Sequence, residues 1–212
     1  MWDLSKIIAS DLVGARVNNQ LPVLMAEGSR TGAVVTVANS EAVRVAMAPT
    51  ITTQVLIVDI ALARIELLKL IFNWASKAAD AQEWHATINH ECTPESAKRF
   101  LRLIETGSFE SLKARLPHIK YLHDDLSRDG VVAKIRDTLG GEGVGVIYAS
   151  NIELYLGNLL FDQPKASKEQ FRTNLLNLMG DETILLRSDS VFMASHAGRK
   201  KAEETWVFSG SK

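Results

Sequence analysis

Short apolar runs alternate along the chain with segments whose apolar residues recur every three or four positions. The apolar runs predict buried strands at residues 33–38, 54–59, 119–123, 144–149 and 183–187, with a last strand at 205–208. The periodic segments predict helices at residues 3–15, 40–48, 65–74, 127–139, 152–160 and 169–179. Because helices separate the strands, we expect an α/β fold with a doubly wound, mostly parallel sheet.

Residues from about 77 to 117 interrupt this alternation with a helical pattern that is polar and broken. Apolar residues still give it one packing side, which indicates a helical insertion or lid over one sheet edge. An N-terminal helical segment is expected within residues 1–30. Since the chain has neither internal repeats nor a long linker, the sequence predicts a single domain over residues 1–212.

The composition is that of an ordinary globular protein, with 24 basic against 25 acidic residues and a net charge of −1. Because binding to a phosphate backbone needs a basic face, we expect no nucleic-acid partner. The single cysteine, Cys92, excludes an internal disulfide and fits a reducing compartment. The N-terminus has no signal-peptide pattern and no stretch reaches about 18 apolar residues, so we expect a cytoplasmic protein without a membrane span. His85 and His90 lack the i, i+4 spacing of a zinc-binding helix, and no metal site is predicted.

Polar side chains follow four of the predicted strands. Asp59 ends the second strand, Asp124 and Asp125 follow the third, and the segments 39–41 and 150–151 follow the first and the fourth. Carboxyl ends of parallel strands meet at one edge of a sheet, so these groups are expected to line one crevice, in which Asp59 can accept both hydroxyl hydrogens of a ribose. Each acidic group also has a structural alternative. Asp59 can cap a helix, and Asp124 with Asp125 can form the acidic first turn of the next helix.

The segment 145–156 is the most informative part of the chain, because an apolar run passes at once through Ser150 and Asn151 into a helical pattern. We expect both of these side chains to face a cavity at the strand end, with Tyr148 on the same side as Ser150. The alternative is that Ser150 or Asn151 only caps the following helix.

The order of these motifs, together with Tyr148-Ala149-Ser150-Asn151-Ile152-Glu153-Leu154-Tyr155-Leu156, resembles the class I S-adenosylmethionine-dependent methyltransferases, which have a Rossmann-like fold. The segment is most similar to bacterial methyltransferase-like proteins with a Tyr-x-Ser-Asn-Val-Glu-x-Tyr-Leu signature, and more distantly to aminocarboxypropyl transferases that build betaine lipids. Residues 171–175 and 181–187 also resemble that group. The similarity therefore covers roughly residues 32–190.

The resemblance implies roles at the strand ends. It assigns Asp59 to the ribose of S-adenosylmethionine, Asp124 or Asp125 to the adenine edge, and Ser150 with Asn151 to the amino-acid end of the cofactor or to the acceptor substrate.

The loop after the first strand departs from that family. In the family this loop is glycine-rich because the backbone approaches the methionine part of the cofactor closely. Here residues 37–42 contain no glycine. Side chains on Ala38 and Asn39 would narrow the space for the cofactor tail, so either the tail lies differently or the site has degenerated.

The resemblance leads us to expect a transferase that uses S-adenosylmethionine to move a methyl or an aminocarboxypropyl group onto a small molecule or a peptide. Tyr148 or Asn151 would orient the acceptor, and Asp125 or Glu153 would be its general base. The alternative is a non-catalytic Rossmann-like module that binds a nucleoside or a partner protein, and an NAD or nucleotide-sugar enzyme comes third. The sequence gives no indication of an oligomeric state.

Overall fold

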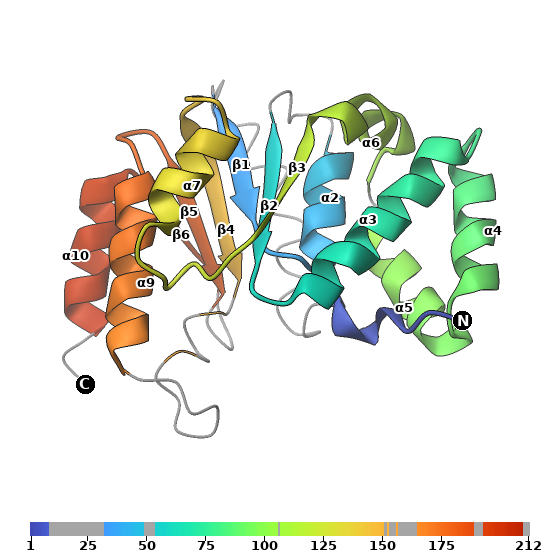
Figure 1. The fold of residues 1–212 in the computed structure, drawn as a ribbon, viewed down its shortest axis with the longest axis horizontal. Helices are drawn as coiled ribbons and strands as arrows, with labels where there is room; N and C mark the ends of the chain where they lie inside the picture. Colours follow the sequence, from blue (N-terminus) through green and yellow to red (C-terminus); the bar gives the residue numbers. More distant parts are fainter. Residues whose placement is uncertain are drawn as a thin grey trace.

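The computed structural model describes residues 1–8, 32–48, 54–105, 107–150, 152, 156, 165–188 and 193–209. Within these ranges one six-stranded sheet has the order β3-β2-β1-β4-β5-β6 (Figure 1). The strands are β1 (Ala33–Thr36), β2 (Val55–Asp59), β3 (Ile119–His123), β4 (Val144–Ser150), β5 (Ile184–Ser188) and β6 (Met193–Ala197). All neighbouring strands are parallel except β5 and β6, which are antiparallel. The expected α/β class with a doubly wound, mostly parallel sheet is confirmed.

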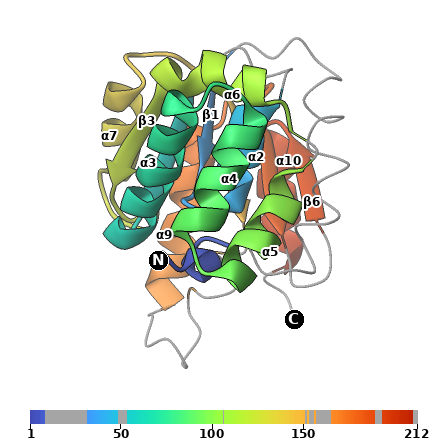
Figure 2. The ribbon, with the colours of Figure 1, turned by 90° about the vertical axis from the view of Figure 1, so that its right-hand side faces the viewer.

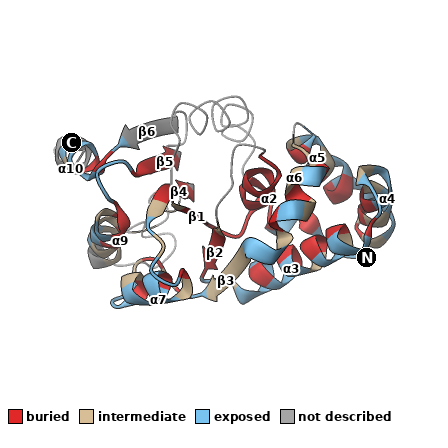
Figure 3. Ribbon diagram, turned by 90° about the horizontal axis from the view of Figure 1, so that it is seen from above, coloured by how far each residue is buried: buried red, intermediate tan, exposed pale blue. Residues whose placement is uncertain are grey.

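Helices cover both faces of the sheet (Figure 3). One face carries α2 (Ser40–Met47), α3 (Leu62–Lys77), α4 (Ala81–Glu91), α5 (Pro94–Ile104) and α6 (Phe109–Arg115). The other face carries α7 (Val131–Thr138), α9 (Lys165–Leu178) and α10 (Arg199–Ser209). Two short 3-10 turns, η1 (Leu4–Lys6) and η2 (Leu116–His118), complete the described helical elements.

The buried core has two halves because the sheet is apolar on both faces. Along β2, Val55 and Ile57 pack in the cluster formed with α2 to α6, whereas Leu56 and Val58 pack in the cluster formed with α7 and α9. A strand that is buried on both faces needs apolar residues at every position. This requirement explains why apolar runs locate the inner strands, whereas β3 at the edge of the sheet contains Lys120 and is only half-buried.

The helices predicted between residues 77 and 117 are present as α4, α5 and α6. They pack mainly on α2 and α3, and so form an outer layer of helices instead of a lid over a sheet edge (Figure 2). Trp84 on α4 is fully buried, and its indole Nε1 donates a hydrogen bond to the carbonyl of Ile71 on α3 at 3.2 Å. Lys113 on α6 donates through Nζ to the carbonyls of Ser76 at 3.0 Å and Ala78 at 2.9 Å, at the end of α3. These contacts fix the outer layer to α3.

The C-terminal prediction is wrong in part. Residues 205–208, expected as a strand, belong to the helix α10, and the last strand is β6 at 193–197. Gly198 turns the chain with a φ of 80°, and the helix-forming residues 200–204 then start a helix that carries residues 205–208 with it. An Arg199 to Glu203 ion pair at 2.8 Å supports its first turn.

The helix predicted at 127–139 begins later, at Val131. The Asp125 carboxylate accepts from the amide of Ser127 at 2.8 Å and from its hydroxyl at 2.7 Å, which holds a turn ahead of the helix. Gly130 then enters the helix with a φ of 79°. Of the predicted N-terminal helix the described residues hold only the turn η1, and most of the helix predicted at 152–160 lies outside the described residues.

Candidate functional site

The carboxyl ends of the parallel strands meet at the lower edge of the sheet in Figure 1. The strand order reverses between β1 and β4, because the chain continues from β1 to β2 on one side and from β4 to β5 on the other. Ligands of open α/β sheets bind in the crevice outside such a point of reversal. The candidate site therefore comprises the ends of β1 to β4 and the loops that follow them.

Asp59 joins two of these loops. Its Oδ2 accepts from the amide of Ala38 at 3.1 Å, and its Oδ1 accepts from the amide of Ala61 at 2.8 Å. Only 7% of the residue is exposed, and burial raises the pKa of its carboxyl, although the two amides and the nearby Arg64 and His123 oppose that shift. The helix-capping alternative is wrong in its simple form, because Ala61 is the N-cap of α3 and Asp59 bonds to the amide of that residue itself.

Asp124 lies beside Asp59 at the same edge, since the amide of Asp124 donates to the carbonyl of Asp59 at 3.2 Å. Its side chain is buried, with Oδ2 accepting from Lys134 Nζ at 2.5 Å and Oδ1 accepting from the amide of Asp125 at 2.8 Å. Burial alone would raise the pKa of Asp124, but the bonds from Lys134 and Asp125 outweigh it and hold the pKa below its usual value. The alternative of an acidic first helical turn is wrong for both residues, because α7 starts only at Val131 and has no acidic residue in its first turn.

The loop after β1 is closed at every described position. Ala38 is fully buried, and Asn39 is the N-cap of α2, with its Oδ1 accepting from the amide of Glu41 at 3.0 Å. The turn η1 packs against the start of the same helix, because the carbonyl of Ile7 accepts from the amide of Ser40 at 2.7 Å. The Oδ1 of Asn39 thus caps the helix.

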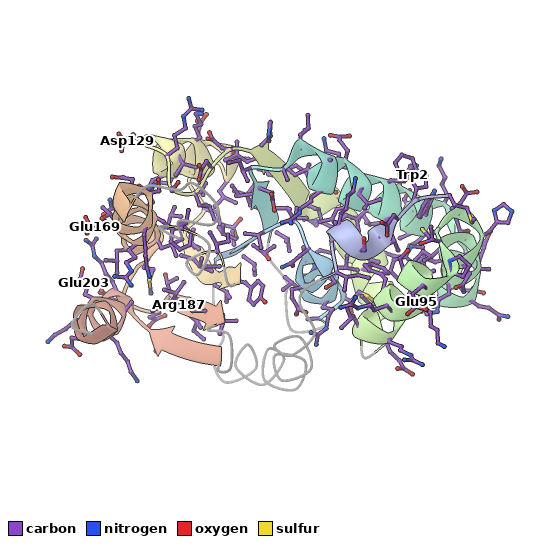
Figure 4. All side chains as sticks on the ribbon, turned by 90° about the horizontal axis from the view of Figure 1, so that it is seen from below. Trp2, Glu95, Asp129, Glu169, Arg187 and Glu203 are labelled. Atoms are coloured by element: carbon purple, nitrogen blue, oxygen red, sulfur yellow. The ribbon has the colours of Figure 1, made fainter. Side chains whose placement is uncertain are left out.

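Tyr148 is buried, with 2% of its surface exposed, in the half of the core that α2 to α6 cover. It pairs with Leu186 of β5, whereas Ser150 pairs with Arg187, so β4 has one residue more than β5 between these two pairs. This extra residue interrupts the alternation on which the expected common side of Tyr148 and Ser150 rests. Arg187 is buried at the end of β5 (Figure 4).

The backbone of Ser150 ends β4, but its side chain lies outside the described residues, as do Asn151 and Glu153. Their roles stay predictions.

Sequence reasoning missed two apolar residues at the rim. Ile60 and Leu62 follow Asp59 directly and are 63% and 49% exposed. His123 fixes the same turn, because its Nε2 lies 2.9 Å from the carbonyl of Ile60. The sequence does contain an indication of this apolar rim, because an apolar residue follows directly on the acidic residue that ends the strand.

No cluster of three or more histidine, cysteine or acidic side chains that could hold a metal occurs among the described residues. Cys92 is buried, and burial raises the pKa of its thiol to about 11, so the thiolate is scarce at neutral pH. Neither feature adds chemistry to the strand-end crevice.

No protein-family model and no curated protein matches the sequence. Among solved structures, the chain is similar to the rRNA methyltransferase aviRa from Streptomyces viridochromogenes, with a TM-score of 0.56 and 12% sequence identity over 92% of this chain and 88% of that chain. At this identity the likeness shows the fold alone, which is a class I methyltransferase-like α/β fold. The resemblance to the bacterial proteins with the Tyr-x-Ser-Asn-Val-Glu-x-Tyr-Leu signature stays a prediction. No helix in the described part of the chain has the length and apolar character needed to cross a bilayer.

Proposed function

We propose that the chain is an S-adenosylmethionine-dependent transferase that moves a methyl or an aminocarboxypropyl group onto a small molecule or a peptide. The observation that carries this proposal is the composition of the strand-end rim. A buried carboxylate, Asp59, stands beside an exposed apolar residue, Ile60, at the ends of a parallel sheet of methyltransferase type. The hydroxyl groups of a ribose need an acceptor such as the Asp59 carboxylate, and a flat purine ring needs an apolar surface such as the Ile60 side chain.

Asp59 can take the ribose without giving up its contacts. An ionised carboxylate offers about four acceptor positions, and the amides of Ala38 and Ala61 occupy two of them. The two amides also fix the orientation of the carboxylate before a ligand arrives. A positioned acceptor loses less entropy on binding than a mobile one, which favours Asp59 for this role.

The adenine edge is assigned to the loop after β3. Asp124 is held by Lys134 and by the amide of Asp125, and Asp125 accepts twice from Ser127. Either carboxylate could accept a hydrogen bond from the exocyclic amine of the base. Ile60 would lie against the face of the ring, where its exposed side chain gains by leaving water.

Transfer from a sulfonium needs alignment more than covalent help. When bound, S-adenosylmethionine supplies an activated carbon whose bond to sulfur breaks as the acceptor attacks, and the bond electrons stay on sulfur. Tyr148 or Asn151 would orient the acceptor, and Asp125 or Glu153 would take the proton that it loses. Ser150 would lie with Asn151 at the amino-acid end of the cofactor.

A second candidate is a non-catalytic Rossmann-like module that binds a nucleoside. It is favoured by the loop after β1, in which Ala38 and Ser40 are fully buried and the amide of Ser40 donates to the carbonyl of Ile7, the residue after η1. Such a module would keep the nucleoside contacts of Asp59 and lack room for a transferable group.

Calorimetry and thermal-shift measurements with S-adenosylmethionine and S-adenosylhomocysteine test the proposal. A ligand present at 100 times its Kd stabilises the native state by about 2.7 kcal/mol, which raises Tm by several degrees. No shift with either compound at millimolar concentration would contradict the transferase. A shift with adenosine but not with these two compounds would support the non-catalytic module.

The acceptor is tested separately with radiolabelled S-adenosylmethionine. Small metabolites and peptides are the expected acceptors, and ribosomal RNA is included because the solved neighbour is an rRNA methyltransferase. Label incorporated only into RNA would contradict the proposed acceptor class and leave the transferase proposal intact.

A further inference from the structure

The loop between β3 and α7, residues 124–130, carries the two acidic residues of the proposed adenine edge. One turn within it is closed by the amide of Arg128, which donates to the carbonyl of Asp125 at 2.9 Å. The amide of Asp124 fixes the start of the loop to the carbonyl of Asp59 at 3.2 Å. A loop backbone gains conformational entropy whenever it is released. Contacts from outside the loop therefore decide how firmly its carboxylates keep one direction.

Asn174 on α9 supplies such a contact. This helix lies beside α7 on the same face of the sheet (Figure 1). The Nδ2 of Asn174 donates to the carbonyl of Leu126 at 2.8 Å and to the carbonyl of Arg128 at 3.0 Å. These two carbonyls flank Ser127, whose amide and hydroxyl both donate to the carboxylate of Asp125. Asn174 thus holds the stretch of backbone to which the Asp125 carboxylate is bonded.

The position of Asn174 on its helix shows that packing alone does not explain it. Phe171, Leu175 and Leu178 recur at three- and four-residue spacing and are buried in the core on this face, and Asn174 shares their side with 3% of its surface exposed. A buried amide is costly unless it is hydrogen-bonded. Both hydrogens of Nδ2 are bonded to the loop, and Oδ1 accepts from Gln170 Nε2 at 3.0 Å. A leucine would suit the apolar stripe equally well, so the amide is accounted for by the loop that it holds.

We propose that Asn174 is a positioning residue of the nucleoside site, which holds the loop after β3 in the conformation that directs its carboxylates at the exocyclic amine of adenine. The inference rests on the proposed function and adds to it a residue of α9 that makes the base loop selective. A base with an oxo group in place of that amine would bring two acceptors together, which costs free energy. A looser loop could turn its carboxylates away from the oxo group. The preference for adenine over hypoxanthine therefore depends on Asn174.

The test compares two ligands on the intact protein by calorimetry. The first is S-adenosylhomocysteine, and the second is S-inosylhomocysteine, in which an oxo group replaces the exocyclic amine. The wild-type protein should bind the first about ten- to a hundredfold more tightly, as expected for a hydrogen bond to a charged group.

Asn174→Leu should reduce this preference to about threefold or less, mainly by weakening the binding of S-adenosylhomocysteine. Arg136→Met is the matched control, because Arg136 Nη2 donates to the carbonyl of Asn177 at 2.7 Å and so joins α7 to α9 without touching the loop. It should keep the full preference. A role in stability alone would lower Tm and leave the ratio of the two affinities unchanged. If Asn174→Leu does not fold, Asn174→Ser, whose side chain is too short to reach both carbonyls, serves the same comparison.

A folded Asn174 variant that keeps the full preference overturns the inference, and the proposed function stands. Equal affinity of the wild-type protein for the two ligands also overturns it, because the loop then does not distinguish the exocyclic group, whereas the binding of S-adenosylhomocysteine still supports the proposed function. Failure of both S-adenosylmethionine and S-adenosylhomocysteine to bind refutes the proposed function, and the inference with it.

Discussion

The helices α2 and α3 follow neighbouring strands and carry the same kind of ion pair, yet their surroundings are opposite. Glu41 and Arg44 on α2 are 2.7 Å apart with side chains 0% and 5% exposed, whereas Glu66 and Lys69 on α3 are 2.8 Å apart with side chains 56% and 43% exposed. α2 begins inside the protein, and α3 begins beside the exposed Ile60. One end of the strand-end crevice is therefore closed around charge, and the other is open and apolar.

Under the proposed function, this difference determines what each end can offer a ligand. At the open end, the rim is already formed, so the free-energy cost of reorganising it on binding is small. At the closed end, a ligand would have to replace hydrogen bonds that the protein already makes.

Breaking the buried pair should have the largest effect. Arg44→Met leaves the Glu41 carboxylate buried without its counter-charge, and should lower the free energy of unfolding by about 3–5 kcal/mol. Lys69→Met breaks the exposed pair and should change it by about 0.5 kcal/mol or less. Urea denaturation of both variants at pH 7 measures the contrast.

The pH dependence sharpens the same contrast. The pKa of Glu41 is raised by burial, so the native state takes up its proton more readily than the unfolded chain does. Without Arg44 this tendency increases, and the destabilisation of Arg44→Met should shrink as the pH falls through the raised pKa. A cost that is constant between pH 7 and pH 5 would contradict the buried charge.

Asp59→Asn should have the next largest effect. Asparagine has one acceptor oxygen, so one of the two amides that now bond to Asp59 would face an N–H group. We expect a loss of about 1–3 kcal/mol in the free energy of unfolding. Asp129→Asn on the exposed turn is the control and should lose nothing measurable. Unchanged stability in Asp59→Asn would show that Ala38 and Ala61 find other acceptors.

Asn39→Ala should cost about 1 kcal/mol, because it removes the side-chain cap of α2. Asp80→Ala removes the corresponding cap of α4 at an exposed position, where Asp80 accepts from the amide of Glu83 at 2.9 Å. Because water can reach the amide of Glu83 and not that of Glu41, the loss should be larger in Asn39→Ala. Thermal denaturation of the two variants side by side decides the order.

Ile60→Ser should have the smallest effect on stability, within about 0.5 kcal/mol, since the side chain is exposed. Under the proposed function it should weaken the binding of S-adenosylhomocysteine about fivefold, which corresponds to about 1 kcal/mol of lost apolar contact. Calorimetry on this variant, with Lys77→Ser at the far end of α3 as control, measures the difference. An unchanged affinity would remove Ile60 from the site.

The sequence predicted the sheet because its inner strands are apolar on both faces, and it predicted Asp59 and Asp124 at one edge because Asp59 ends one predicted strand and Asp124 directly follows another. It could not predict the contacts of these residues. Asp59 meets the amide of Ala38, 21 positions earlier, only because β1 and β2 pair in parallel in one particular register.

The sequence also did not predict that the charged side chains of Glu41 and Arg44 are buried. Glu41 and Arg44 lie on one side of a short helix, a pattern that normally indicates a solvent-exposed face. The packing of α5, α6 and η1 around α2 decides otherwise. At the C-terminus, the β-branched and aromatic residues 205–208 favour a strand locally, but the helix formers before them prevail.

The extra residue in β4 changes the register of its pairing with β5. Before it, residues of β4 pair with β5 one for one, and at Ser150 the count has moved by one position. Deleting Ala149 would restore one-for-one pairing up to the last residue of β4. The length of this one strand, more than the chemistry of its last residue, thus sets the register in which β4 ends.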